Sequence, residues 1–175
     1  MERGEINPLW RLWRAEGYRM MDMLEEAIGE MKALGEEGSR WLETHMVTAA
    51  IKYDERDWAG LLPLARRLRE LFPETARWIS YEAESLNHLV GVWEATRCVL
   101  RALPRFPKET EFRYLLHYLH RDSGNHENAR YWISEALRLD PEARNIVESA
   151  GSCRRGVAAP IFAAPRKVPR AKKGS

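Results

Sequence analysis

The feature that most constrains the fold is a proline that recurs every 34 residues, at Pro73, Pro107 and Pro141. Proline cannot continue a helix and it also restricts the residue before it, so each of these prolines marks the end of a helical segment. A fixed period of this length predicts that the chain repeats one supersecondary unit.

Small and apolar residues keep the same spacing. One column contains Ala27, Leu61, Ala95 and Ala129, a second contains Leu34, Leu68, Ala102 and Ala136, and a third contains Ala15, Ala49 and Ala83 but ends at His117. Residues seven apart share one helix face, and small side chains there let paired helices approach closely. The columns predict four units, at about residues 8–41, 42–75, 76–109 and 110–143.

Helical periodicity runs through the units, whereas strand-like alternation and hairpin turns are absent. We therefore expect an all-α fold. The expected first helices are 8–20, 42–55, 76–89 and 110–122, and the expected second helices are 24–36, 58–71, 92–105 and 126–139. The large aromatic residues Trp10, Trp78, Trp93 and Trp132 are expected to pack in the core.

The fourth unit resembles a known family most clearly. Gly124, Ala129, Ile133, Ala136 and Pro141 stand where the tetratricopeptide repeat (TPR) pattern places Gly, Ala, a large apolar residue, Ala and Pro. The resemblance covers about 135 of the 175 residues and weakens toward the first unit. The chain is also similar to small bacterial TPR proteins of unassigned role. The resemblance implies a right-handed α-solenoid whose first helices line a concave groove for an extended peptide or a partner helix.

Under this resemblance, the candidate binding residues are first-helix positions that point away from the second helices. They are Met46, Tyr53, Ser80, Glu84, Asn87, His88, Tyr114, Tyr118 and Arg121, with Leu12, Glu16 and Arg19 at the matching positions of the first unit. The set mixes aromatic, polar and oppositely charged groups. It suits a protein or peptide ligand better than nucleic acid, which would require a basic stripe. We therefore expect an interaction scaffold or adaptor.

Catalytic and metal-binding motifs are not evident. The sequence contains no GxSxG, P-loop, GxGxxG or HExxH pattern, so neither an enzyme nor a cofactor is expected. His117 and His120 share a helix face and could begin a metal site. No cysteine or acidic set completes such a site, so these histidines are expected to pack or to line the groove.

Charge is distributed unevenly along the chain. The formal net charge is +2, yet seven of the 28 Lys and Arg residues follow Glu148 and no acidic residue does. We expect residues 1–149 to form the TPR array, ending in a short capping segment, and residues 150–175 to form a disordered basic tail. The tail could stay solvated, or contact nucleic acid, an acidic partner or the acidic array itself. Apolar surface exposed at an array end would favour a homo-oligomer.

Two further features concern the compartment. The two cysteines are too few for a disulfide framework, which favours a reducing cytoplasm. No apolar run approaches the length of about 18 residues needed to span a membrane, so no membrane association is expected.

Overall fold

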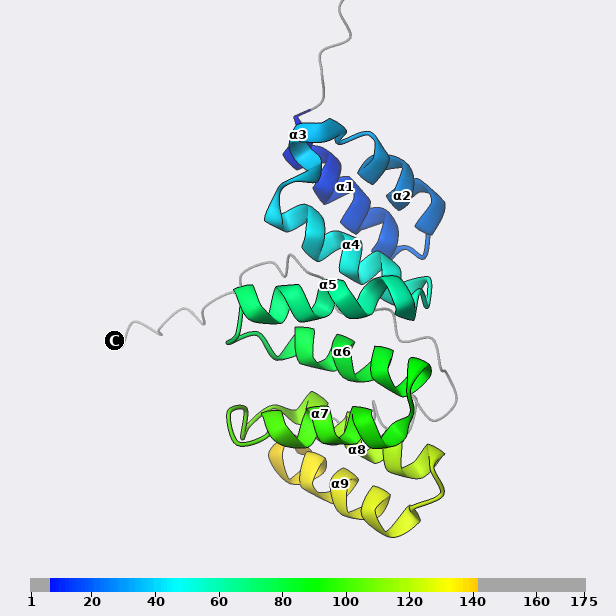
Figure 1. Cartoon of the computed structure of the whole chain (residues 1–175), viewed down its shortest axis with the longest axis vertical. Coiled ribbons are helices and arrows are strands. Elements are labelled where there is room, and N and C mark those ends of the chain that lie inside the picture. The colour runs from blue at the N-terminus through cyan, green and yellow to red at the C-terminus, as the bar shows by residue number, and fades with distance from the viewer. Residues whose placement is uncertain (1–6, 142–175) are drawn as a thin grey trace, which may run out of the picture. The chain divides into compact units, whose positions relative to one another are not determined.

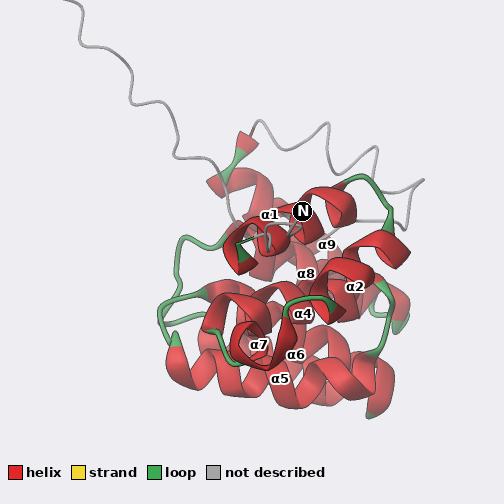
Figure 2. Cartoon of the chain, turned by 90° about the horizontal axis from the view of Figure 1, so that it is seen from above, coloured by secondary structure: helices red, strands yellow, loops and turns green. Residues whose placement is uncertain are grey.

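The computed structural model describes residues 7–141, and every regular element among them is a helix (Figures 1 and 2). The first helices are α1 (Pro8–Met20), α4 (Leu42–Asp54), α6 (Ala76–Leu89) and α8 (Thr110–Asp122). The second helices are α2 (Leu24–Lys32), α5 (Trp58–Leu71), α7 (Val92–Ala102) and α9 (His126–Leu139), and a short α3 (Gly35–Ser39) precedes α4. The predicted helices are observed, and packing within a predicted pair is seen for α1 with α2, α6 with α7 and α8 with α9. The predicted capping segment beyond Pro141 and the predicted basic tail lie outside the described residues.

Two second helices end earlier than predicted. Helix α2 ends at Lys32 rather than at residue 36, and Gly35 follows with a φ of +71°, outside the right-handed helical region. Helix α7 ends at Ala102 rather than at residue 105, because Pro104 has no N–H with which to extend the helix. The columns locate helices well, but local backbone chemistry decides where each one stops.

The turns between paired helices use polar caps and glycines. The Asp57 side chain accepts a hydrogen bond from the Gly60 N–H at 2.9 Å, and the Asn125 side chain accepts one from Asn128 at 3.2 Å. Such caps satisfy N–H groups that a helix start leaves without partners. Gly91, which precedes α7, has φ +138° and ψ 170°, a region that only glycine enters freely.

We predict that Gly91→Ala lowers the free energy of unfolding by about 1–3 kcal/mol, because an L side chain is strained at this φ and ψ. Urea denaturation measures the change. Gly29→Ala is the matched control, because Gly29 lies within α2 with no atom within 4 Å of an added Cβ. The control should be stabilised by about 0.5–1 kcal/mol. Equal stability of Gly91→Ala and the natural chain would contradict the assigned backbone conformation.

The described residues fall into two compact units, 7–47 and 48–141, and the division runs through α4. In the first unit, α1 packs against α2 and both Ala15 and Ala27 are fully buried. The Glu30 carboxylate also links the two helices, through Arg11 at 3.3 Å and Arg14 at 2.9 Å. These contacts explain why α2 stays paired with α1 although its sequence matches the TPR pattern least.

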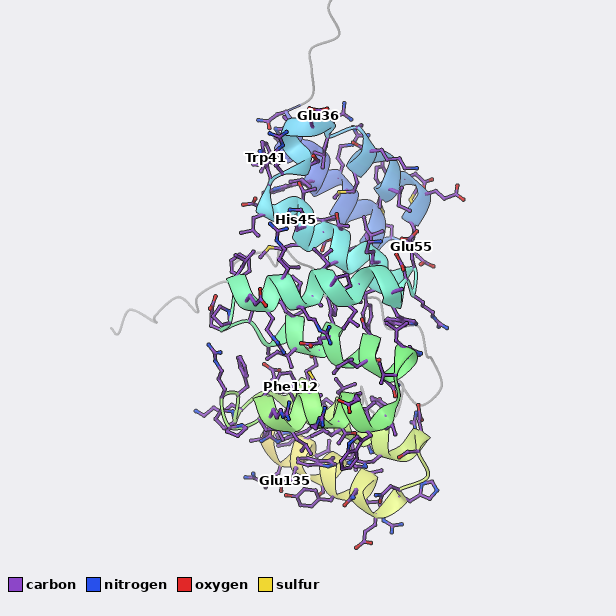
Figure 3. The ribbon with its side chains drawn as sticks, in the orientation of Figure 1. Glu36, Trp41, His45, Glu55, Phe112 and Glu135 are labelled. Carbon is purple, nitrogen blue, oxygen red and sulfur yellow. The ribbon has the colours of Figure 1, made fainter. Side chains whose placement is uncertain are left out.

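In the second unit, successive helices from α5 to α9 pack against one another, and α6 also contacts α8. Their shared core contains Ile79, Ala83, Leu86, Ala95, Val99, Phe112, Leu115, Leu116 and Leu119. Phe112 of this core is labelled in Figure 3. The alanine columns are buried as predicted at Ala83, Ala95, Ala129 and Ala136. Small residues therefore do lie where these helices approach one another.

The prediction of a core role for every large aromatic residue is partly wrong. Trp78 is buried, with 2% of its surface exposed, and Trp132 packs against the core, but Trp10 and Trp93 are 64% and 72% exposed. Helix α7 buries Ala95, Thr96 and Val99, and Trp93 lies on the opposite side of that helix. Among the described residues no helix precedes α1, so none covers the side that carries Trp10.

Candidate functional site

The first helices of the second unit bring several predicted binding residues together. The rings of Tyr53 on α4 and Tyr81 on α6 stack with centroids 4.8 Å apart and planes inclined by 20°. Glu84 lies one turn beyond Tyr81, and α6 packs directly against α8, which carries Glu111. We use the name first-helix face for the accessible side chains of Tyr53, Glu84, Glu111 and Tyr114 together with the buried Ser80 and Tyr81.

The Glu84 carboxyl is the most perturbed acid on this face. The side chain is half-buried, and it makes no hydrogen bond or ion pair within the described residues. Burial raises the pKa of Glu84 to about 7, and the negative charges of Glu111 and Asp122 contribute to the increase. A carboxyl in this environment gains from any cation or hydrogen-bond donor that approaches it.

The neighbours of Glu84 share this electrostatic environment. Burial raises the pKa of the Tyr53 hydroxyl, with Glu84 as the next cause. Desolvation by the surrounding protein also raises the pKa of Glu111, although its side chain is exposed. Glu84 is half-buried, so its raised pKa reflects the removal of water from this face more directly. The nearby Ser80 hydroxyl opposes the increase at Glu111. Ser80 itself is 4% exposed.

Two further predicted residues, Tyr118 and Arg121, contact each other on α8, which also carries Tyr114 of the first-helix face. The Arg121 guanidinium lies 4.8 Å from the centre of the Tyr118 ring and pairs with Asp122 at 3.1 Å. Burial raises the pKa of the Tyr114 hydroxyl, and the charge of Asp140 adds to the increase. Tyr114 therefore lies close to the point where the chain leaves α9.

The remaining predicted residues are placed differently. The His88 ring stacks on Trp58 of α5 at 4.3 Å, and burial together with the charge of Arg56 lowers the pKa of His88. His88 thus belongs with the start of α5. Asn87 is half-buried on α6. Met46 is half-buried in the first unit, so it is not part of the set that the second unit assembles.

The matching positions of the first unit are buried. Leu12 and Arg19 are 0% exposed and Glu16 is 6% exposed, and the Arg19 guanidinium donates to the Glu16 carboxylate at 2.9 Å. An ion pair from which water is removed must be well hydrogen-bonded to be tolerated. The first unit thus buries the side of α1 that the TPR resemblance assigns to the binding groove.

Sequence reasoning did not identify Tyr81 and Glu111. Glu111 stands 34 residues after Arg77, near the start of the first helix, so the repeat period could have included this column among the candidates. Tyr81 carried no such signal. Its stacking on Tyr53 depends on how α4 and α6 are placed in space, which the sequence pattern does not specify.

The predicted packing role of His117 is observed. Its Nδ1 lies 2.8 Å from the Ala129 carbonyl oxygen, so the histidine links α8 to α9 at the point where it interrupts the alanine column. Burial lowers the pKa of the neighbouring His120. Within residues 7–141, no group of three or more His, Cys, Asp or Glu side chains is arranged to hold a metal ion.

Apolar side chains line two shallow hollows elsewhere. One, of about 230 Å³, lies on α7 between Trp93 and Leu100, and the other, of about 170 Å³, lies on α1 beside Trp10 and Trp13. Neither hollow includes a residue of the first-helix face. None of the helices in the described range combines the length and apolar character needed to cross a bilayer.

Comparisons with known proteins identify the fold. No family model and no curated protein matches the sequence. A solved structure of MamA (MSR-1) matches with a TM-score of 0.63 and 16% identity over 82% of each chain, and one of MamA (AMB-1) matches with a TM-score of 0.59 and 18% identity over 87% of this chain and 82% of that one. YrrB, described as a TPR protein with an unusual peptide-binding site, matches with a TM-score of 0.61 and 14% identity over 78% of this chain and 71% of that one. The predicted all-α, TPR-like solenoid fold is confirmed.

Proposed function

We propose that the protein is a non-catalytic interaction scaffold whose first-helix face binds an extended peptide segment or a helix of a partner protein. The observation that supports this most is Glu84, a half-buried carboxyl surrounded by other acids and without a hydrogen bond or ion pair within the described residues. A lysine or arginine of a ligand would provide the missing counter-charge. The TPR-like fold supports the same class of function, because YrrB, which shares it, is described as having a peptide-binding site.

The face combines two kinds of recognition. The half-buried rings of Tyr53 and Tyr114 offer amphipathic area against which aliphatic parts of a peptide can pack. Glu84 and Glu111 would favour a cation near them, because burial raises the pKa of both carboxyls and the charge of Glu111 raises the pKa of Glu84 further. A bound cation should lower the pKa of Glu84, so binding should release a proton near pH 7.

We predict that Glu84→Gln weakens binding of a lysine-containing peptide by about ten-fold at pH 8, the size of one charge-assisted hydrogen bond. The probe is a pool of synthetic peptides of about ten residues with a central Lys or Arg, and a matched pool carries Glu at the centre. Calorimetry should show binding of the basic pool that strengthens from pH 6 to pH 8, as Glu84 ionises with a pKa of about 7. The glutamine variant should lose this pH dependence.

Glu135→Gln is the control, because Glu135 is held by Arg138 on α9, outside the first-helix face. It should bind the basic pool as the natural chain does. Equal binding of both pools, or a Glu84→Gln variant with unchanged affinity and pH dependence, would rule out Glu84 as the ligand contact.

Within this proposal the protein is a cytoplasmic adaptor, with residues 1–149 as the array and residues 150–175 as an appended basic tail. Two alternatives depend on residues beyond the described range. Nucleic-acid association would use the tail, and self-assembly would use the end of the array after the fourth unit. The first-helix face, by contrast, is formed by described side chains, and for this reason we favour a peptide ligand.

A further inference from the structure

The first-helix face and the C-terminal segment of the same chain carry opposite charges. From Ala150 to Ser175 the sequence contains seven Lys and Arg residues and no Asp or Glu. The face presents Glu84 and Glu111, and the charge of Asp122 reaches Glu84 from the end of α8. The segment therefore has the chemistry that the proposed function requires of a ligand.

The chain leaves the described residues beside this face. Asp140, which immediately precedes Pro141, is close enough to Tyr114 for its charge to raise the pKa of that hydroxyl. Tyr114 lies three residues after Glu111 on α8, so the two side chains share one side of that helix. The described chain therefore ends near the part of α8 that carries Glu111.

The connecting segment is long enough to reach them. Thirteen residues lead from Pro141 to Arg154, and an extended chain of this length spans up to about 40 Å. Helix α8, with 13 residues, is about 20 Å long. The segment is therefore long enough for its first basic residues to lie alongside α8.

We propose that residues 154–173 bind to the first-helix face of their own chain and there compete with the peptide ligand. This inference rests on the proposed function, because it assigns the same face to an internal ligand. Since a tethered segment acts at an effective concentration near the millimolar range, even weak docking would reduce the affinity for an external peptide. We expect a reduction of about ten-fold at low salt and a smaller one at high salt, because the contacts are ionic.

Cys153 provides a probe next to the basic segment. Cys98 is half-buried and burial raises the pKa of its thiol to about 11, so a thiol-reactive nitroxide at neutral pH should modify Cys153. In the full chain, amide NMR signals around Glu84 and Glu111 should broaden, and they should sharpen in 0.5 M salt. A Glu84→Gln, Glu111→Gln double variant should lose the broadening, whereas Glu135→Gln should retain it.

A mixed sample separates the possible occupants. Isotope-labelled chains without nitroxide are combined with unlabelled chains that carry it, so that only contacts between copies are seen. Broadening of the face in this mixture that accounts for the broadening in the full chain would assign the face to a second copy and overturn docking within one chain. The proposal would also be overturned if the amide signals of the face do not broaden in the full chain, or if their broadening persists in the double variant.

A second measurement distinguishes failure of this inference from failure of the proposed function. The seven basic residues after Ala150 are replaced by serine in the full chain, and the lysine-centred peptide pool is titrated into it. Tighter binding by about ten-fold than in the natural chain is the expected result. Equal binding by both chains would contradict docking of the basic segment but would still support the peptide-binding face. If neither chain binds the peptide pool, both the docking of the basic segment and the proposed function are contradicted.

Discussion

Phe112→Ala should lower the free energy of unfolding of the second unit by about 3–5 kcal/mol. Phe112 is 0% exposed and its ring meets that of Phe106 edge-on, with centroids 5.6 Å apart. Truncation removes this contact and leaves a cavity among Leu115, Leu116 and the residues of α7. For a chain of this length the loss corresponds to a decrease in melting temperature of roughly 10 °C.

Trp10→Ala is the matched control, because Trp10 stands at the same repeat position as Phe112 but is 64% exposed. Its replacement should change the free energy of unfolding by less than about 1 kcal/mol. Hydrogen exchange of amides in α8 and in α1 measures the effect in each unit separately, which a single global melt does not. Comparable losses in the two variants would mean that Trp10 is packed as deeply as Phe112.

The contrast between Phe112 and Trp10 shows which structural features a repeat pattern predicts and which it does not. The 34-residue columns locate the helices because each helix needs a small or apolar face against its neighbour, as at Ala83 and Ala95. The columns do not indicate whether a neighbouring helix is present. Phe112 is covered by a preceding helix and Trp10 is not, although both occupy one column. Burial at the start of a repeat array therefore does not follow from the period.

The candidate site was predictable to a similar extent. The TPR resemblance led to Tyr53, Glu84 and Tyr114, because these positions repeat on the first helices. The stacking of Tyr81 on Tyr53 and the raised pKa of Glu84 arise from distances between helices. Such distances depend on side-chain volumes at every contact, so spacing along the chain does not reveal them.

Ionised Glu84 should make the fold less stable as the pH rises from about 4.5 to about 7. Its pKa is about 7 in the folded chain, compared with 4.5 for an ordinary glutamate, so between these values the folded state holds the proton and the unfolded state does not. Stability contributed by the protonated form is therefore complete below pH 4.5 and is lost by pH 7. We estimate the loss at about 2 kcal/mol, which allows for partial access of solvent to the half-buried side chain.

Glu84→Gln should therefore be about 2 kcal/mol more stable than the natural chain at pH 8 and about equally stable at pH 4.5, as measured by urea denaturation. The informative quantity is the difference in the free energy of unfolding between the two chains. The lowered pKa of His88 makes each chain more stable as the pH rises toward 6.5, the opposite of the Glu84 effect. Because both chains contain His88, its contribution cancels from the difference. The raised pKa of Glu111 acts in the same direction as that of Glu84, but its causes do not include Glu84, so it also cancels from the difference. Glu135→Gln, whose carboxyl pairs with Arg138, should show no such stabilisation at pH 8. If the difference in the free energy of unfolding between Glu84→Gln and the natural chain is constant from pH 4.5 to pH 8, Glu84 titrates normally. The first-helix face would then lack the unfavourable buried charge that favours a basic ligand.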